Sequence, residues 1–301
     1  MVASSLLEYI TSNPQETKRL LGIDYQQLQW LIVEAEALFN QSQAVEEESK
    51  VRIIKKGGGR KPKLAVTEQI LLTLVYLHHM PTFQLLGVQF GVSESTAHNI
   101  FHDWIKILGE LLPPSLLEQV KKKSNNWEKY KEVLEQWILV VDSSEQARER
   151  PTDYSNQKKY YSGKKKSHTL KNQFIILPDG SEIVDVTIGK PGPSSDINLF
   201  RERREKFATS QKFKADKGYI GESQIETPHK KPKLQELSID QKRENKEIST
   251  QRIVVEHIIR LVKIFRVATE RFRLRPKHYD QVIQIVCGLV RLRIGALMLA
   301  M

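Results

Sequence analysis

The sequence has only one cysteine, Cys287, so no disulfide bond can form within the chain. Its Cys and His residues show none of the spacings of a structural zinc site. The N-terminus lacks a basic start followed by a long apolar stretch, which predicts that there is no signal peptide. The apolar C-terminal end carries Arg291 and Arg293, which are costly at the centre of a bilayer, so we interpret it as a core helix. These absences predict a cytoplasmic protein that does not cross a membrane.

Positive charge, by contrast, is abundant. Lys and Arg number 47 against 36 Asp and Glu, which gives a formal net charge of +11. This excess favours a polyanionic partner, because each cation that neutralises a phosphate releases a counterion. A basic soluble enzyme without such a partner would have the same balance. The 301 residues, 40% hydrophobic and 28% charged, are typical of a folded protein of about two domains.

The hydrophobic pattern changes along the chain. Helical periodicity covers residues 3–40 and 67–112, and strand-like apolar runs follow from residue 137. Residues 43–63 contain three consecutive glycines among Lys and Arg, which is typical of a flexible basic linker. It is either a solvated loop or an arm that touches phosphates. We therefore predict a helical segment (1–42), a linker (43–63), an all-α helix-turn-helix domain (64–125) and a C-terminal α/β domain (134–301).

The segment FQLLGVQFGVSESTAHNIFH, residues 83–102, has the pattern of a helix-turn-helix motif. Gly87 falls where the two helices touch, and Gly91 falls at the turn, where a positive φ is needed. The second helix would present Ser95, Thr96 and Asn99 to the DNA major groove. The alternative is a helical hairpin used only for packing or dimerisation.

Three carboxylates stand out downstream. Asp142 and Asp216 each follow an apolar, strand-like run, WILVVD and KFKAD, although each could simply cap a turn. Glu256 lies in RIVVEHIIRLVKIF, a helical segment expected to be largely buried, on one stripe with Arg252 and Lys263. Charge on a buried helix is costly unless it is paired or metal-bound. An ion pair between Arg252 and Glu256 is the alternative.

Converging carboxylates are suited to hard cations such as Mg²⁺. Two such ions can activate a water or a DNA 3′-hydroxyl for in-line displacement at phosphorus. A basic surface for the phosphodiester would come from the lysines near the first aspartate: Lys158, Lys159, Lys164, Lys165, Lys166 and Lys171. The interleaved Tyr160 and Tyr161 either stack on unpaired bases or belong to an ordinary strand.

The order of motifs along most of the chain resembles that of a known family. It includes VVDSSE, YSGKKKSHTLKNQ, PGPSSDINLFR, ADKGYIG, TPHKKPK and QRIVVEHIIRLVKIFR, after the stretch that begins GGGRKPK. In these motifs the chain resembles bacterial insertion-sequence transposases of the DDE class, in the insertion sequence five group and its Harbinger-like relatives. The resemblance implies that the C-terminal domain has a ribonuclease-H-like catalytic fold.

The resemblance also implies roles for individual residues. Asp142, Asp216 and Glu256 correspond to the catalytic, metal-binding triad, with the second Asp after the fourth core strand. Arg252 and Lys263 match two DNA-positioning members of a Tyr-Arg-Glu-Lys signature, in which Ser249 replaces the Tyr. His168 lies in a family motif and is either a phosphate contact or a structural histidine. Asp196 is interpreted as a helix cap and stays outside the triad, and Glu145 as a surface residue.

The expected function is that of a transposase. Such an enzyme binds terminal inverted repeats, cleaves double-stranded DNA with Mg²⁺ or Mn²⁺, expected as two ions, and joins the freed 3′-hydroxyl to target DNA. We expect a nucleoid-associated homo-oligomer in a bacterial cytoplasm. Two alternatives remain: a non-catalytic helix-turn-helix regulator derived from a transposase, and a ribonuclease-H-like nuclease without joining activity.

Overall fold

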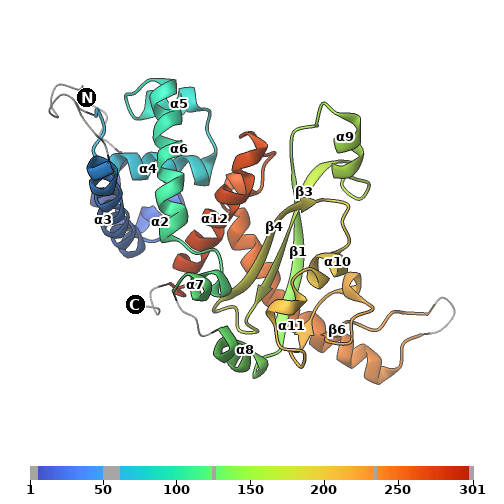
Figure 1. Cartoon of the computed structure of the whole chain (residues 1–301). Coiled ribbons are helices and arrows are strands. Elements are labelled where there is room, and N and C mark those ends of the chain that lie inside the picture. The colour runs from blue at the N-terminus through green and yellow to red at the C-terminus, as the bar shows by residue number, and fades with distance from the viewer. Residues whose placement is uncertain (1–5, 50–61, 124–126, 233–235, 298–301) are drawn as a thin grey trace. The chain divides into compact units, whose positions relative to one another are not determined.

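The computed structural model describes residues 6–49, 62–123, 127–232 and 236–297, which form two compact units (Figure 1). The first unit runs to Leu112 and includes Phe265–Val267, and the second comprises the rest. The boundary therefore falls between Leu112 and Pro113 and not near residue 125 as the sequence suggested. Pro113 and Pro114 end the preceding helix, and the following helix already packs on the sheet of the second unit.

The first unit is entirely helical in its described residues. Its helices are α1 (Leu6–Ser12), α2 (Thr17–Leu21), α3 (Tyr25–Ser49), α4 (Val66–His79), α5 (Phe83–Gln89) and α6 (Glu94–Leu111). Helix α3 continues through residues 43–49, which the sequence analysis assigned to the linker. The reason is local, because this stretch contains Ala44 and three glutamates, all good helix formers, and has no Gly or Pro. The glycines of the predicted linker lie outside the described residues.

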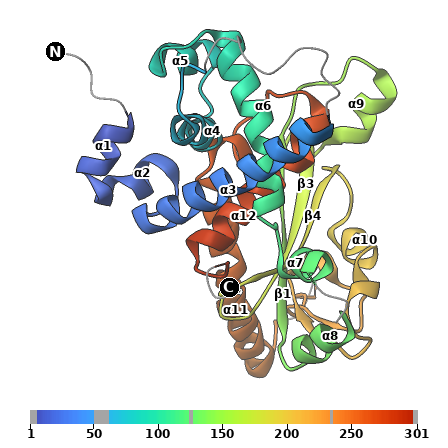
Figure 2. The same cartoon turned by 60° about the vertical axis from the view of Figure 1, so that its left-hand side comes forward.

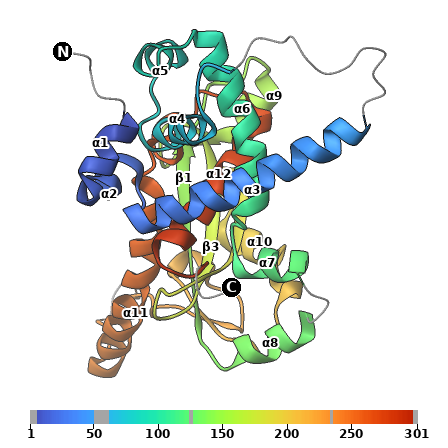
Figure 3. The same cartoon turned by 90° about the vertical axis from the view of Figure 1, so that its left-hand side faces the viewer.

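Helix α4 is the centre of the first unit. Its residues from Ile70 to Leu77 are all buried, as expected for a helix that is apolar around its circumference. Helices α2, α3 and α6 pack against it, and α3 also crosses α6 (Figure 3). The Trp104 indole donates a hydrogen bond to Gln69 Oε1 (2.9 Å), which satisfies its polar atom inside this core.

The second unit is built on a sheet of six strands within the described residues. The strands are β1 (Leu139–Ala147), β2 (Tyr161–Ser162), β3 (Ser167–Ile176), β4 (Ile183–Pro191), β5 (Phe213–Lys214) and β6 (Ile225–Glu226). The helices are α7 (Leu116–Lys123), α8 (Trp127–Glu135), α9 (Tyr154–Tyr160), α10 (Asp196–Arg201), α11 (Ile239–Lys263) and α12 (Tyr279–Arg293).

The sheet has the order β4-β3-β1-β5-β6. Strands β1, β3 and β4 are antiparallel neighbours, whereas β5 is parallel to β1 and β6 is parallel to β5. The two-residue strand β2 pairs with the start of β3. This order and these directions confirm the ribonuclease-H-like fold that the family resemblance implied, with β5 as the fourth core strand.

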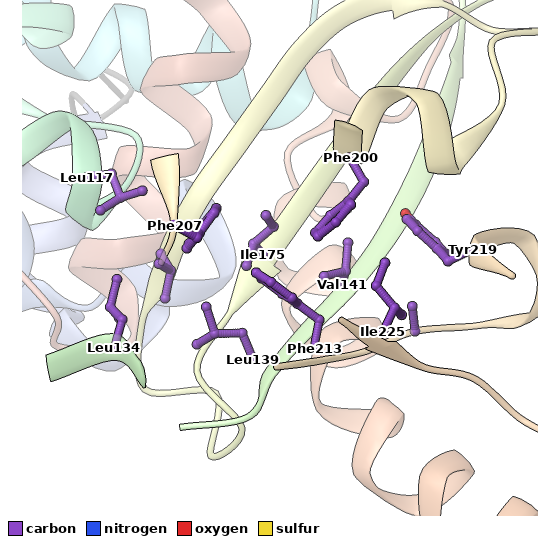
Figure 4. Close-up of a cluster of buried hydrophobic side chains, with 12 residues drawn as sticks. Leu117, Leu134, Leu139, Val141, Ile175, Phe200, Phe207, Phe213, Tyr219 and Ile225 are labelled. Carbon is purple, nitrogen blue, oxygen red and sulfur yellow. The ribbon is translucent and has the colours of Figure 1, made fainter. Parts of the chain in front are cut away.

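Helices cover both faces of this sheet (Figure 2). On one face, side chains of β1, β3 and β5 form a buried cluster with α7, α8 and α10 (Figure 4). Its members include Leu139 and Val141 of β1 and Phe200 of α10. Helices α11 and α12 pack on the other face, against β1, β3 and β4. Because side chains alternate along a strand, Val140 and Asp142 point to this second face.

Helix α12 confirms the expected core helix at the C-terminal end. Arg291 is fully buried, and its guanidinium is bound by both carboxylate oxygens of Glu182, at 2.6 and 2.7 Å. Burial raises the pKa of the Cys287 thiol, one turn earlier, to about 12. Within the described residues, no helix combines the length and apolarity that a membrane crossing requires.

Candidate active site and DNA-binding helix

The sequence suggested that Asp142 lies at the end of a strand, but it lies in the middle of β1. The strand continues to Ala147 because its polar half keeps pairing with β3, from Ser143 opposite Gln173 to Ala147 opposite Thr169. Asp142 Oδ1 accepts a hydrogen bond from the Ser143 N–H at 2.7 Å. Its side chain is only 18% exposed and faces α11.

Asp216 lies beside Asp142. Strands β1 and β5 are parallel, with Val140 opposite Lys214, and each aspartate comes two residues after this pair. Lys214 reaches Gln251 of α11, so residues of this parity, including Asp216, point to the α11 face. Asp216 caps the 3₁₀ helix η3 (Lys217–Tyr219) by accepting a hydrogen bond from the Gly218 N–H at 2.8 Å.

Glu256 and Arg252 come from α11. Arg252 Nη2 lies 3.5 Å from Asp142 Oδ2 and 4.0 Å from Glu256 Oε1, so the guanidinium stands between the two carboxylates. The sequence prediction that this helix segment is largely buried was wrong. Only one face is buried, and Ile253 and the Glu256 side chain are more than half exposed, at 57% and 61%.

Both Asp216 and Glu256 lie close enough to Asp142 for their charges to act on its carboxyl group. Burial is the main reason that the pKa of Asp142 is raised above its usual value, and the negative charges of Asp216 and Glu256 raise it further. The Ser143 N–H and the Arg252 guanidinium oppose this increase. Asp142 is therefore a carboxylate that would be stabilised by additional positive charge.

Two lysines extend the site. Burial and the nearby ammonium group of Lys165 lower the pKa of Lys263, and the carboxylate of Asp142 opposes that shift. Lys165 belongs to the exposed turn between β2 and β3, together with Lys164 and Lys166. The predicted basic surface and the acidic site thus meet at Lys165 and Lys263.

Two other basic candidates differ from the turn lysines. Lys171 does not belong to the basic surface, because it is buried and donates hydrogen bonds to Asp196 Oδ1 (3.0 Å) and to the Ser194 carbonyl (2.6 Å). His168 lies at the start of β3 opposite Tyr161. Its pKa is lowered by partial burial and by Arg150 and Arg148, which favours the neutral ring.

The first unit contains the expected pair of helices, α5 and α6. Gly91 has φ +67°, and Ser93 caps α6 by accepting a hydrogen bond from the Thr96 N–H (3.2 Å). Ser95, Thr96 and Asn99 are all exposed on α6. The hydroxyl groups of Ser95 and Thr96 also lie 3.0 and 2.8 Å from Ser93 Oγ, so Asn99 is the candidate least involved in the cap.

Comparisons with known proteins agree with both units. The model of the DDE superfamily endonuclease matches residues 141–291, and the model of the helix-turn-helix of DDE superfamily endonuclease matches residues 62–114. A probable transposase for insertion sequence element IS702 from Microchaete diplosiphon is 35% identical over 239 residues, which are 78% of this chain and 83% of that protein. The chain belongs to the DDE superfamily of insertion-sequence transposases.

Solved structures of another transposase give weaker matches. The Mos1 transposase paired-end complex with the left transposon end is 14% identical, covers 78% of this chain and 88% of that chain, and has a TM-score of 0.19. A pre-cleavage Mos1 transpososome is 13% identical over 76% of this chain and 86% of that chain, with a TM-score of 0.18. Scores this low add nothing to the assignment of the fold or the site.

The acidic residues of this transposase have the type of ligand atom, carboxylate oxygen, that a hard divalent cation prefers. Asp142 of β1, Asp216 at the end of β5 and Glu256 of α11 supply oxygen ligands, and burial, followed by the charges of the other two carboxylates, raises the pKa of Asp142. In the described part of the chain, however, no three His, Cys, Asp or Glu side chains are close enough to enclose a metal ion. The Arg252 guanidinium occupies the space between Asp142 and Glu256 and supplies the positive charge there.

Some residues near the transposase site were not identified from the sequence. Tyr219, Ser143 and Gln173 form buried hydrogen bonds on the opposite face of the sheet, next to both aspartates. Asp196 was interpreted as a helix cap, but it pairs with Lys171 and Ser195 precedes α10 without a side-chain cap. Glu145 accepts a hydrogen bond from Thr169 on that same opposite face, so it lies away from Asp142.

The close contact of α5 and α6 leads to a prediction about the DNA-binding unit. A Cβ at Gly87 would lie 2.7 Å from the Val92 carbonyl oxygen, a backbone atom that no side-chain rotation can move away. We expect Gly87→Ala to destabilise the first unit by about 1–3 kcal/mol and to weaken DNA binding. Thermal unfolding and electrophoretic mobility shift would measure both effects. Unfolding and DNA binding of Gly87→Ala that equal those of wild type would contradict this close contact.

Proposed function

We propose that this protein is a catalytically active transposase that cleaves the ends of its own element and joins them to target DNA. The main support is the placement of Asp142 and Asp216 on adjacent parallel strands, with Glu256 on the helix that covers the same sheet face. A non-catalytic regulator would gain nothing from burying Asp142 among like charges, because the arrangement costs stability.

In this proposal Asp142, Asp216 and Glu256 hold one or two Mg²⁺ or Mn²⁺ ions. When bound, the ions would lower the pKa of an attacking water or 3′-hydroxyl and stabilise the leaving oxygen. The 61% exposed side chain of Glu256 has room to turn away from Arg252 and toward the aspartates. Arg252 would then be available to a phosphate, for which its planar guanidinium is well suited.

The basic residues would hold the DNA. Lys263 and Lys165 lie near Asp142 and are suited to the phosphates on either side of the scissile bond, and Lys164 and Lys166 to the flanking backbone. His168, whose lowered pKa favours the neutral ring, would donate a hydrogen bond to DNA. Asn99, with Ser95 and Thr96, would read the terminal inverted repeat from α6.

A complete reaction requires that two element ends meet, so we propose that the active form is a homo-oligomer. Its substrate is double-stranded DNA, and its expected place is the nucleoid of a bacterial cytoplasm.

The test uses purified protein and a labelled duplex that carries the inverted repeat flanking the coding sequence. Wild type is expected to cut at the repeat end with Mg²⁺ and not with EDTA, whereas Asp216→Ala should bind the duplex and leave it intact. Cleavage by Asp216→Ala would refute the assignment of the triad. Specific binding without cleavage by either protein would favour the DNA-binding regulator.

A further inference from the structure

A series of buried and partly buried hydrogen bonds connects the two aspartate-bearing segments from behind the sheet. The Tyr219 hydroxyl accepts a hydrogen bond from Gln173 Nε2 at 3.0 Å and shares another with Ser143 Oγ at 2.9 Å. Ser143 directly follows Asp142, and Tyr219 comes three residues after Asp216. One phenol therefore links the backbone beside both carboxylates, on the face that the carboxylates do not occupy.

This series of hydrogen bonds is anchored at its far end by an ion pair between buried Lys171 and partly buried Asp196. Lys171 and Gln173 are buried on β3 and both reach Asp196, at the start of α10. Lys171 Nζ donates to Asp196 Oδ1 at 3.0 Å, and Gln173 Nε2 donates to the Asp196 carbonyl at 2.9 Å. Removing either partner of such a pair would leave a buried charge uncompensated, so this anchor resists displacement.

The turn after Asp216 is held on its other side. A Cβ at Gly218 would lie 2.9 Å from Asp216 Oδ1 and 3.2 Å from Asp196 Oδ2, so the backbone of η3 is enclosed by the two carboxylates. Such a constraint is needed, because β5 contributes only the pairs of Phe213 and Lys214 to β1. Two paired residues alone would leave the position of Asp216 weakly fixed.

We propose that Tyr219, Ser143 and Gln173, anchored by the Lys171–Asp196 pair, are positioning residues that fix the separation of the Asp142 and Asp216 carboxylates. The inference rests on the proposed function, since this separation matters chiefly if the two carboxylates share a metal ion. Groups of this kind act through the ligands and do not touch the ion or the DNA.

The structure supplies a closely matched pair of variants. Tyr279 is also buried, and its hydroxyl accepts a hydrogen bond from Asn172 Nδ2 (2.8 Å) and donates one to Gln146 Oε1 (3.0 Å), four residues after Asp142 on β1, so neither partner is Ser143 or a residue of η3. Tyr219→Phe and Tyr279→Phe each remove one buried hydroxyl with two partners. We therefore expect similar decreases of the melting temperature for the two variants.

Two measurements separate positioning from stability. The first is a calorimetric titration with MgCl₂, in which Tyr219→Phe is expected to raise the dissociation constant about 10–100-fold and Tyr279→Phe to leave it unchanged. The second needs no metal: amide hydrogen exchange of Ser143 and Gly218, which donate to Asp142 Oδ1 and Asp216 Oδ1. Both amides should exchange faster in Tyr219→Phe than in Tyr279→Phe.

The milder variant Ser143→Ala provides a second test if Tyr219→Phe folds poorly. It breaks the same hydrogen bond from the other side, so its effect should have the same direction and should not add to that of Tyr219→Phe. Equal exchange and equal metal affinity in Tyr219→Phe and Tyr279→Phe would overturn the positioning role and leave the proposed function intact. If the amides exchange faster in Tyr219→Phe but the wild-type protein binds no metal and cuts no DNA, the positioning role is upheld and the proposed function is refuted.

Discussion

Asp142→Asn is expected to abolish DNA cleavage and strand joining while making the metal-free protein at least as stable as wild type. The loss of activity should exceed about 100-fold, because even an outer partner of a metal ligand costs about 10–100-fold when removed. Asparagine keeps the shape of the side chain and can still accept the hydrogen bond from the Ser143 N–H. Binding of inverted-repeat DNA should be retained, since α6 is unchanged.

The effect on stability follows from the raised pKa of Asp142. A carboxyl group whose pKa is higher in the folded than in the unfolded protein binds its proton more tightly in the folded state. Stability is therefore lost as the pH rises from about 3.9, the ordinary pKa of aspartate, through the raised value. The asparagine variant has no such group. Its gain in stability over wild type should therefore be absent below this pH range and complete above it.

Thermal unfolding with EDTA between pH 4 and 8, and again with Mg²⁺ at neutral pH, would check this. Mg²⁺ should stabilise wild type, by about 2.7 kcal/mol at one hundred times its dissociation constant, and should have little effect on the variant. A variant that is less stable than wild type at pH 8 in EDTA would contradict the described environment of Asp142. Lys106→Met, in an exposed ion pair on α6, controls for the loss of a surface charge.

Arg291→Met is expected to lower the stability of the second unit by about 3–5 kcal/mol, because it leaves the carboxylate of Glu182, only 12% exposed, without its partner. It also removes the hydrogen bonds to the Pro113 carbonyl and Gln119 Oε1, both 2.8 Å long. The melting temperature should fall by about 6–20 °C, at roughly 2–4 °C per kcal/mol for a unit of this size.

Two further variants test the cause of this loss. Adding Glu182→Gln to Arg291→Met should recover the part due to the unpaired charge, but not the part due to Pro113 and Gln119. Arg271→Met removes the same type of side chain from an exposed pair with Glu149, at 3.9 Å, and should cost less than about 1 kcal/mol. Similar melting temperatures for Arg291→Met and Arg271→Met would show that the buried pair is not needed for the fold.

The sequence predicted the main elements of this transposase because they leave local signals. The run WILVVD identifies β1 and includes Asp142, and the two glycines of the helix-turn-helix are required locally, Gly87 by the nearby Val92 carbonyl and Gly91 by its positive φ. Glu256 was found because three charged residues follow one stripe of a helix. The site residues themselves stay predictions until the variants are measured.

Three of the errors have a common physical cause, because they concern partners far apart in the chain. Lys171 was assigned to the basic surface, since a lysine in a polar segment is usually solvated, and its partner Asp196 is 25 residues away. Tyr219 gave no signal of its own, because its partners on β1 and β3 are 76 and 46 residues away. The pairing of β1 with β3 beyond Asp142 likewise depends on the neighbouring strand, so the apolar run alone did not show where β1 ends.

The alternating faces of β1 have a consequence for how such a protein can change over generations. Leu139 and Val141 pack in the apolar cluster, whereas Asp142 points to α11. Insertion or deletion of a single codon between Leu139 and Asp142 would turn every later side chain of the strand over. The carboxylate would then enter the apolar cluster and Ser143 would face α11. Descendants of this element can therefore exchange residues in β1 one at a time, but they cannot change its length without losing both the site and the core.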